Sequence, residues 1–267
     1  MGADIKRLRT RIKSVDSTLH MTKAMGLVAS SKIRRAADSM LKGRQYALAL
    51  EDMVAQLMTS DECRKSPYAA RRDGGRTRLL VVAGDRGLAG GYNANIFRLM
   101  REYPDAEVIP VGKRACDRYG AEILPAEGFS YRDAKSIADT LCRDFAEGKF
   151  DRFGIVCTKY HSLMSQEACV KWLLPLTAEE DKAASCAIFE PDEVTVLNAV
   201  IPEYIAGMIV SCVKESFACE VAARRVAMDS AGKNEQEMID RLGLEYNRAR
   251  QSAITQEITE IVAGSGI

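Results

Sequence analysis

The sequence predicts a mixed α/β protein whose two long terminal helices form an antiparallel, left-handed coiled coil, with an α/β domain inserted between them in the chain. Three observations predict this fold: a seven-residue apolar repeat at the N-terminal end, a similar repeat at the C-terminal end, and alternating strand-like and helix-like segments between them. We expect, in chain order, a helix over 1–58, a linker over 59–76, an α/β domain over 77–200 and a second helix over 201–267.

The N-terminal repeat has an uncharged residue at alternating steps of three and four. Sixteen positions follow this rule, although more than a quarter of the segment is charged. They are Ile5, Leu8, Ile12, Val15, Leu19, Thr22, Gly26, Ala29, Ile33, Ala36, Met40, Gly43, Ala47, Leu50, Val54 and Leu57. A helix this long, about 80 Å at about 1.5 Å per residue, needs a partner helix for its apolar stripe. A period of about 3.5 residues predicts a left-handed coil, and the small residues in the stripe predict close approach of the two backbones.

The partner helix is predicted at the other end of the same chain. There an apolar stripe again repeats at steps of four and three: Ile205, Ile209, Cys212, Ser216, Cys219, Ala223, Val226 and Ser230. We expect its register to shift near 232–234. A second stripe follows at Leu242, Tyr246, Ala249 and Ala253, and then an apolar tail of Ile254, Ile258, Ile261 and Val262. Two such helices at the ends of one chain predict an antiparallel pair.

The middle of the chain alternates between strand-like and helix-like segments. Strands are predicted over 78–85, 106–112, 153–161 and 167–176, and helices over 93–103, 113–120 and 133–147. This alternation favours a largely parallel sheet, so we expect a Rossmann-like α/β layer. Pro67 and the Gly74–Gly75 pair predict a linker ahead of it.

Composition predicts a protein without an export signal or a membrane span. No run of about 18 apolar residues is present, and the charged N-terminus lacks the apolar core of a secretory signal. We therefore expect the mature protein to begin near residue 1 in a cytoplasm-like compartment. The eight cysteines include no C-x-x-C pair, which predicts reduced thiols, with Cys157 and Cys169 buried in strands. The histidines His20 and His161 lack metal-ligand spacing.

A glycine-rich turn follows the first predicted strand and suggests the alternative of a nucleotide-binding enzyme. Its glycines are Gly84, Gly87, Gly90 and Gly91, a spacing that fits neither G-x-G-x-x-G nor G-x-x-x-x-G-K-[ST]. No lysine follows that could reach a phosphate. We favour turn geometry and close packing of a helix on a strand as the reason for these glycines. A nucleotide-binding α/β protein with helical arms is kept as the alternative.

Positive charge gathers at the N-terminal end of a chain whose net charge is only +1. Residues 1–44 hold eleven Lys or Arg against three Asp, a net of +8, whereas 205–267 hold seven bases against nine acids, a net of −2. A basic helix is typical of nucleic-acid binders, but no aromatic residue precedes Tyr46 to stack on bases. The positive charge could instead form a solvated helix face or contact an acidic partner.

Three segments carry a resemblance to a known family. They are MTKAMGLVASSKIRRA (21–36), DRGLAGGYNAN (85–95), and the C-terminal block from AARRVAMDSA (222–231) to YNRARQSAITQEITEIVAG (246–264). In content, order and spacing the chain resembles the gamma subunit family of F-type ATP synthases, in its bacterial form. The chain departs from the family pattern at Ala89, where cysteine is usual, at Gly26, where a larger residue is usual, and at Leu19–His20.

The resemblance implies a subunit with no active site and no cofactor of its own. The family forms the central rotor stalk, which couples ion translocation through the membrane sector to ATP synthesis or hydrolysis at the catalytic beta subunits. The implied partners are the alpha and beta subunits of the catalytic ring, the epsilon subunit and the c-ring, with no nucleic acid and no small-molecule substrate. The implied location is the cytoplasmic face of the bacterial cell membrane, as a peripheral protein.

The resemblance also implies which residues touch the ring. Lys23 and Met25 match positions where the family's stalk meets a lever loop of the beta subunit. Polar contacts to the ring are implied for five residues of the C-terminal helix: Arg224, Arg250, Gln251, Thr255 and Glu260. The apolar tail would turn inside an apolar sleeve of the ring, and the basic N-terminal helix would face acidic loops of the beta subunits.

Overall fold

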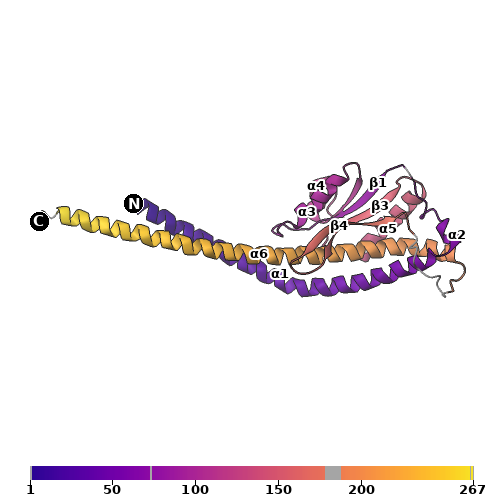
Figure 1. Ribbon diagram of the computed structural model, residues 1–267, viewed down its shortest axis with the longest axis horizontal. Coiled ribbons are helices and arrows are strands. Elements are labelled where there is room, and N and C mark those ends of the chain that lie inside the picture. The colour runs from indigo at the N-terminus through magenta and orange to yellow at the C-terminus, as the bar shows by residue number, and fades with distance from the viewer. Residues whose placement is uncertain (1, 73, 178–187, 265, 267) are drawn as a thin grey trace. The chain divides into compact units, whose positions relative to one another are not determined.

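The computed structural model describes residues 2–72, 74–177, 188–264 and 266 (Figure 1). Its elements are α1 (Gly2–Leu57), α2 (Asp61–Arg64), β1 (Thr77–Val82), α3 (Tyr92–Leu99), the 3-10 helix η1 (Met100–Glu102), β2 (Glu107–Val111), α4 (Lys113–Tyr119), α5 (Tyr131–Ala146), β3 (Arg152–Tyr160), β4 (Gln166–Leu174) and α6 (Glu193–Gly264). The chain divides into two compact units. Residues 1–30 with 224–267 are called here the coil unit, and residues 31–223 the α/β unit. Long terminal helices and an inserted α/β sheet confirm the predicted fold class.

The coil unit pairs the first part of α1 with the last part of α6. Thr22 Oγ1 donates to Glu235 Oε1 at 3.2 Å, and Arg225 Nη1 donates to the Gly26 carbonyl at 3.0 Å. A later residue of α1 thus meets an earlier residue of α6, so the two helices are antiparallel, as predicted. All sixteen predicted stripe positions of α1 are buried or half-buried, which confirms the seven-residue repeat.

The register shift in α6 lies earlier than predicted. Ser230 is exposed, whereas Met228 is buried and Gly232 is half-buried. The buried and half-buried positions follow steps of four and three through Met228, Gly232, Glu235, Ile239, Leu242, Tyr246, Ala249 and Ala253. The second stripe therefore begins at Met228, and the prediction of a shift near 232–234 is wrong.

A charged residue explains why the sequence places this shift too late. Glu235 occupies a stripe position because its carboxylate accepts the Thr22 hydroxyl, so a search for uncharged positions passes over it. In addition, every residue of α6 from 201 to 222 is buried or half-buried, because the helix there packs against both the sheet and α1. Apolar residues in that range do not mark a single face.

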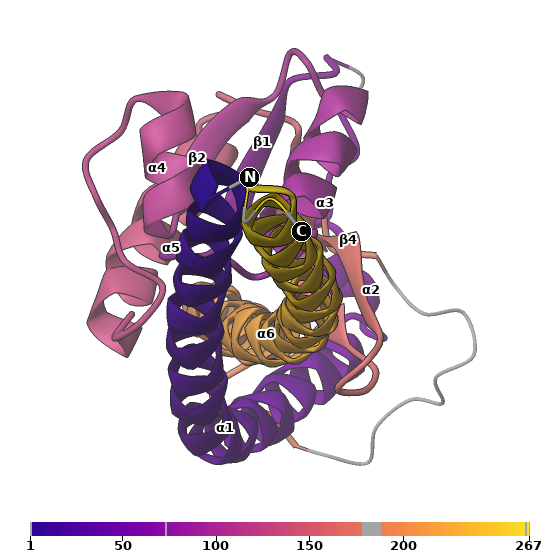
Figure 2. The same cartoon turned by 90° about the vertical axis from the view of Figure 1, so that its left-hand side faces the viewer.

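Four strands form one sheet in the α/β unit, in the order β2-β1-β3-β4. β1 is parallel to β2 and β3, and β4 is antiparallel to β3. Successive β1 residues face opposite sides of the sheet: Leu79 and Val81 pack toward α3 and η1, whereas Leu80 and Val82 pack toward α5 and α6. Figure 2 shows α3 and α5 on opposite sides of β1. The prediction of a largely parallel sheet is confirmed.

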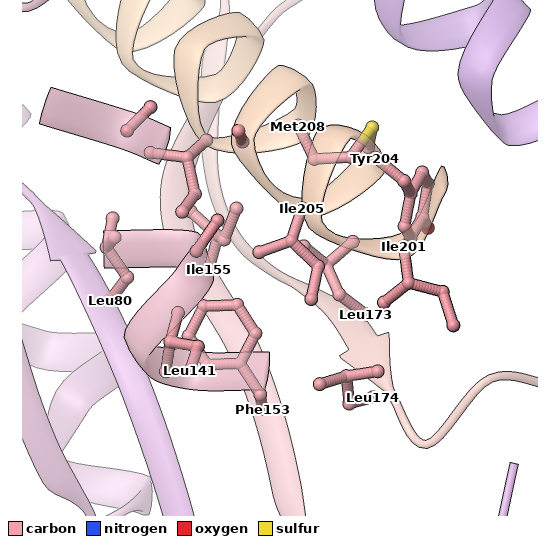
Figure 3. Packing of buried hydrophobic residues seen from close by; sticks show 14 of the residues in the cluster. Leu80, Leu141, Phe153, Ile155, Leu173, Leu174, Ile201, Tyr204, Ile205 and Met208 are labelled. Atoms are coloured by element: carbon pink, nitrogen blue, oxygen red, sulfur yellow. The ribbon is translucent and has the colours of Figure 1, made fainter. Parts of the chain in front are cut away.

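The main core of the α/β unit lies between the sheet, α5 and α6. Phe153 and Ile155 of β3, Leu141 of α5 and Ile205 of α6 are fully buried there (Figure 3). Full burial of such a side chain stabilises a fold by about 1.5–3 kcal/mol. This first part of α6 is therefore part of the α/β core, and not only an arm of the coiled coil.

Helix α6 begins at Glu193, earlier than the predicted start at residue 201. The carboxylate of Asp192 accepts the backbone N–H of Thr195 at 2.9 Å and its hydroxyl at 2.7 Å, which caps the first turn. Pro202 lies inside the helix. Proline is common in a first helical turn, so a sequence-based boundary falls near it, whereas the cap at Asp192 sets the true start.

The segment predicted as a linker, 59–76, packs in part against the α/β core. It contains α2, and Cys63 is fully buried. The ring of Tyr68 stacks on that of Phe145 with a centroid separation of 6.1 Å, and Arg72 Nη1 donates to the Phe145 carbonyl at 2.7 Å. These contacts attach the segment to α5.

One stretch of α6 is apolar enough to cross a membrane, with a mean hydropathy of 1.7 over 18 residues. The window is not an unbroken apolar run, because Glu203 and Lys214 interrupt this part of α6, so the prediction that no run of about 18 apolar residues exists is not contradicted. Of this window, 67% is buried inside the protein, because the helix packs against the sheet and α1. Such burial is typical of the core helix of a globular unit.

The seven cysteines that the structure describes are free thiols, as predicted, and Cys186 lies outside the described residues. Cys157 is buried in β3. Cys169 is only half-buried, contrary to the prediction, because β4 is the edge strand of the sheet.

A largely buried ion pair joins β1 to α5. Arg78 Nη1 and Lys149 Nζ each donate to the Asp144 carboxylate at 2.8 Å. The side chains of Arg78 and Asp144 are 10% and 11% exposed. Hydrogen bonds from Lys149 and Arg78 lower the pKa of Asp144 below its usual value of 3.8.

We expect this carboxylate to make the protein less stable in acid. A carboxyl group with a lowered folded-state pKa stabilises the fold fully above the unfolded value of about 3.9, and this contribution is lost as the pH falls through the folded value. The free energy of unfolding from urea titrations should change little above about pH 5 and decrease below about pH 4. Asp144→Asn should reduce that acid slope. An unchanged slope would contradict the assignment to Asp144.

Candidate partner-contact surface

All seven residues that the resemblance implies as partner contacts lie in the coil unit. Six of them are exposed, and one, Arg224, is half-buried. The exposed residues are Lys23, Met25, Arg250, Gln251, Thr255 and Glu260. Exposed side chains on a two-helix coil are available to a partner.

Lys23, Met25 and Arg224 lie at one level of the coil. At this level Arg225 Nη1 donates to the Gly26 carbonyl at 3.0 Å, so the two helices are held together next to all three residues. Sequence reasoning did not single out Arg225. Of two adjacent arginines on a helix of this kind, one points toward the partner helix and the other turns about 100° away from it. The adjacent arginines Arg224 and Arg225 were the sequence feature that could have indicated this contact.

An apolar row on the outer face of α1 was also missed. Met21, Met25 and Val28 follow steps of four and three and are 59%, 38% and 54% exposed, and Leu27 beside them is 69% exposed. Residues at this spacing share one helix face. Because the row is separate from the stripe that packs on α6, it leaves apolar surface uncovered in the coil unit, and such patches mark interaction sites. The sequence feature that could have revealed this row is its spacing of four and three, which is the spacing of the buried stripe at other positions of the same helix.

Arg250, Gln251, Thr255 and Glu260 form a separate group near the end of α6. At about 1.5 Å per residue, Arg250 lies roughly 40 Å along the helix from Arg224, so the structure does not bring the two groups together. The Thr255 hydroxyl donates to the Gln251 carbonyl of its own helix at 2.9 Å.

Beyond Ala253 the tail of α6 is uncovered. Every residue from Ile254 to Gly264 is exposed, and Ile254, Ile258 and Ile261 are 47%, 57% and 71% exposed. Their spacing of four and three places them on one face. Exposed apolar side chains on one face of this helix end form a candidate interaction surface.

The glycine-rich turn is filled by groups of the protein itself. The N–H of Gly84 donates to Asn93 Oδ1 at 2.9 Å, and the N–H of Arg86 donates to Glu220 Oε1 at 3.3 Å. Glu220 is 2% exposed, and a Cβ on Gly84 would lie 2.7 Å from its carboxyl carbon. A phosphate cradle needs N–H donors directed at the ligand and a favourable field for an anion. Here two donors are engaged and a carboxylate lies beside them, so the turn packs β1 against α6.

Asp85 closes the same turn. Its carboxylate accepts the backbone N–H groups of Lys113, Ala126 and Glu127 at 3.0, 3.0 and 2.6 Å. Lys113 is the first residue of α4, so Asp85 caps that helix and ties the loop after it to the end of β1. The acid in the DRGLAGG motif therefore has a structural role.

Part of the positive charge on α1 is paired within the α/β unit. Arg44 Nη2 lies 2.7 Å from Glu215 Oε1, and Lys32 pairs with Glu127. The basic residues near the start of α1 are exposed: Lys6, Arg7, Arg9, Arg11 and Lys13. Exposed positive charge is thus present on α1 in the coil unit, and also in the α/β unit at Arg34, Arg35 and Lys42.

Comparison with known proteins decides the family. A family model described as ATP synthase matches residues 4–266. A protein of Moorella thermoacetica and one of Ruminococcus albus, both named ATP synthase gamma chain, are each 38% identical to this chain, with 98% of this chain and 98% of the relative covered. The chain belongs to the ATP synthase gamma chain family.

The fold agrees with that of a chain in a solved ATP synthase structure. A chain in the structure of Euglena gracilis mitochondrial ATP synthase, OSCP/F1/c-ring, rotational state 3, matches with a TM-score of 0.70 and 20% identity. The match covers 100% of this chain and 97% of that chain. At this identity the likeness concerns the fold. The long terminal helices and the inserted sheet are therefore a fold that this chain shares with that chain.

Proposed function

We propose that this chain is the non-catalytic central rotor stalk of an F-type ATP synthase, coupling ion translocation through the membrane sector to ATP synthesis or hydrolysis at the catalytic beta subunits. The observation that carries the proposal is the match to gamma chains over 98% of the sequence. The coil unit supports it, because all seven candidate contacts lie there. The partners are the alpha and beta subunits of the catalytic ring, the epsilon subunit and the c-ring, at the cytoplasmic face of the cell membrane.

A stalk can drive its ring only if its faces differ. In the coil unit, α1 carries the exposed apolar row of Met21, Met25 and Val28, whereas α6 carries Arg224 at the same level. A beta subunit therefore meets a different face in each orientation of the stalk. A contact that differs between two conformations of a partner shifts their equilibrium, and the effect is reciprocal. Rotation then changes the affinity of each catalytic site in turn, and ATP hydrolysis there drives rotation.

The coil unit also supplies the stiffness that torque requires. The small stripe residues let the helices approach closely: a Cβ on Gly26 would lie only 3.6 Å from Met228 Cβ. The Thr22–Glu235 and Arg225–Gly26 hydrogen bonds join the helices across the stripe. A closely packed pair resists twisting more than a single helix does.

The exposed tail of α6 is suited to turn inside an apolar part of the catalytic ring. Ile254, Ile258 and Ile261 offer apolar surface to a sleeve in the catalytic ring. Apolar contact is non-directional, so it resists rotation less than a set of hydrogen bonds would. This part of the stalk would hold the axis in place, while the level of Met25 would transmit force.

The test of the function is assembly and rotation. The affinity-tagged chain should co-purify with alpha, beta and epsilon subunits from membranes, and a bead attached to it should rotate when ATP is supplied to the immobilised catalytic ring. Recovery of the chain without those subunits would refute the proposal. Titration calorimetry of the chain with ATP and NAD should give no binding heat, because the N–H groups of Gly84 and Arg86 are already engaged. Saturable binding would favour the nucleotide-binding alternative.

We expect Met25→Lys to uncouple the complex without unfolding the subunit. Met25 is 38% exposed, so a lysine ammonium can reach water, and the free energy of unfolding should change by less than about 0.5 kcal/mol. Against an acidic beta loop the new charge adds an ionic contact that must break at every step. ATP-driven ion pumping per ATP hydrolysed should decrease severalfold in reconstituted vesicles.

Met238→Lys is the matched control for this prediction. Met238 is 43% exposed on α6 in the same unit, so the substitution makes the same chemical change at similar exposure away from the Met25 level. Its coupling ratio should stay close to that of the parent. Equal losses in both variants, or unchanged pumping in Met25→Lys, would contradict the assigned contact.

A further inference from the structure

Three thiols of the α/β unit line one cavity. Cys157 of β3, Cys169 of β4 and Cys212 of α6 border a cavity of about 480 Å³. Cys157 and Cys212 are each 6% exposed, and Cys169 is half-buried. Within the residues that the structure describes, no group of three or more Cys, His, Asp or Glu is arranged to hold a metal ion. The cluster therefore points to thiol chemistry.

Two of these cysteines are positioned to form a bond. Cys157 and Cys169 lie directly opposite each other in the antiparallel β3–β4 pair. Opposite residues in such a pair have Cα atoms about 4.5–5.5 Å apart and side chains on the same face of the sheet. This spacing falls within the range of about 4.4–6.8 Å that disulfides span, so the bond requires rotation of the side chains and little backbone movement.

Cys169 is the thiol that a reagent reaches first. It lies on the edge strand and is half-buried, whereas Cys157 lies on the adjacent inner strand. The hydrogen bond from the Cys157 thiol lowers the pKa of Cys169 to about 7, and the same bond raises the pKa of Cys157. Because the thiolate is the nucleophile, Cys169 attacks and Cys157 follows.

We propose that Cys169 and Cys157 form a dithiol site that undergoes exchange with low-molecular-weight disulfides, ending in a Cys157–Cys169 disulfide. The Cys169 thiolate attacks one sulfur of the reagent RSSR, forming a mixed disulfide and releasing RS⁻. The Cys157 thiol loses its proton to a released thiolate and displaces the second RS group from Cys169. In total, two protein thiols and RSSR give one protein disulfide and two RSH. The protein is oxidised and the reagent is reduced.

The other described cysteines do not compete. Burial raises the pKa of Cys142 to about 12, and burial also raises the pKa values of Cys63 and Cys219. Cys212 contacts Cys157 but lies on a helix, so it has no opposite partner in a strand ladder. The site is independent of the proposed rotor function, because it uses none of the contact residues in the coil unit.

The test is oxidation of the folded, full-length chain by glutathione disulfide at pH 7.5. Cys186→Ser is included in every sample, because that residue lies outside the described part of the chain. After free thiols are blocked with iodoacetamide, mass spectrometry of peptides should show Cys157 linked to Cys169 with the loss of two hydrogens. Iodoacetamide should also alkylate Cys169 of the reduced protein at least about tenfold faster than buried Cys116. Unchanged far-UV circular dichroism shows that the fold is kept.

Single variants separate the roles of the thiols. Cys157→Ser should stop the reaction at a glutathione adduct on Cys169, Cys169→Ser should prevent formation of the cavity disulfide, and Cys212→Ser should leave the Cys157–Cys169 bond unchanged. A Cys157–Cys212 bond in the parent, equal alkylation rates for Cys169 and Cys116, or no reaction with glutathione disulfide would overturn the proposal.

Discussion

Replacing Gly112 with valine is expected to lower the free energy of unfolding by more than about 4 kcal/mol, or to prevent folding of the α/β unit. Gly112 joins β2 to α4 with φ +89 and ψ 141, a conformation that only glycine adopts readily. A Cβ at this position would lie 1.9 Å from the carbonyl oxygen of Ala83, just after β1. Because that oxygen is a backbone atom, only movement of β1 relative to β2 relieves the clash.

Gly120→Val is the matched control for this substitution. Gly120 also has a positive φ, +66, but a Cβ there would meet nothing within 4 Å. Its cost should therefore be limited to backbone strain, about 1–3 kcal/mol. Urea titrations followed by circular dichroism should show a much larger loss for Gly112→Val. Equal unfolding midpoints for the two variants would show that the close approach of Gly112 to Ala83 does not constrain the fold.

The second large effect is expected for Asp85→Ala, which should lower the free energy of unfolding by about 2–4 kcal/mol. The substitution removes the acceptor of three backbone N–H groups, at Lys113, Ala126 and Glu127. Hydrogen bonds to a charged group contribute about 1.5–3 kcal/mol each, and water recovers part of that at the exposed positions. α4 also loses its N-terminal cap. Urea titrations of the full-length chain measure the loss.

Two further variants isolate the cause. Asp85→Asn keeps one carbonyl oxygen in place, so its loss should lie between those of the parent and Asp85→Ala. Asp117→Ala removes an exposed carboxylate from α4 itself and should cost less than about 0.5 kcal/mol. If Asp85→Ala were as stable as Asp117→Ala, the proposed cap would be wrong. Each of the three variants Asp85→Ala, Asp85→Asn and Asp117→Ala should still assemble with the catalytic ring, provided that it folds.

The sequence was most informative where burial has one dominant period. In α1 a single stripe packs on α6, and each of its sixteen predicted positions is buried or half-buried. The strands of the sheet were also located within a few residues, because each is a short apolar run between turns. In α1 one face of the helix is packed, and in the sheet each strand is one short apolar run. The pattern of apolar residues in the sequence therefore matches the pattern of burial.

The sequence was less informative where two packing surfaces share one helix or a polar contact replaces an apolar one. The first part of α6 packs against both the sheet and α1, which hides the register, and Glu235 occupies a stripe position through its hydrogen bond with Thr22. The start of α6 depends on a cap at Asp192 that local composition does not distinguish from an ordinary loop acid.

The candidate contacts could be named only because the sequence resembles a family. The structure shows that six of these seven residues are exposed and that they lie in two separate groups. Neither fact follows from residue type. The apolar row at Met21, Met25 and Val28 has a spacing that is visible in the sequence, but only the pairing of α1 with α6 shows which of two apolar registers is left uncovered. The Arg225–Gly26 bond likewise required coordinates.

The carboxylate between the two helices of the coil restricts how they can slide past each other. Glu235 Oε1 accepts the Thr22 hydroxyl, and Oε2 is buried without a hydrogen-bond partner among the described residues. A slip of one heptad would place Glu235 opposite Val15 or Ala29, whose side chains cannot donate a hydrogen bond. The carboxylate would then lose the Thr22 hydroxyl while still buried, which is unfavourable in both directions. This polar contact thus favours one alignment of α1 and α6. A force along the axis of the coil would have to break the contact before one helix could slide past the other.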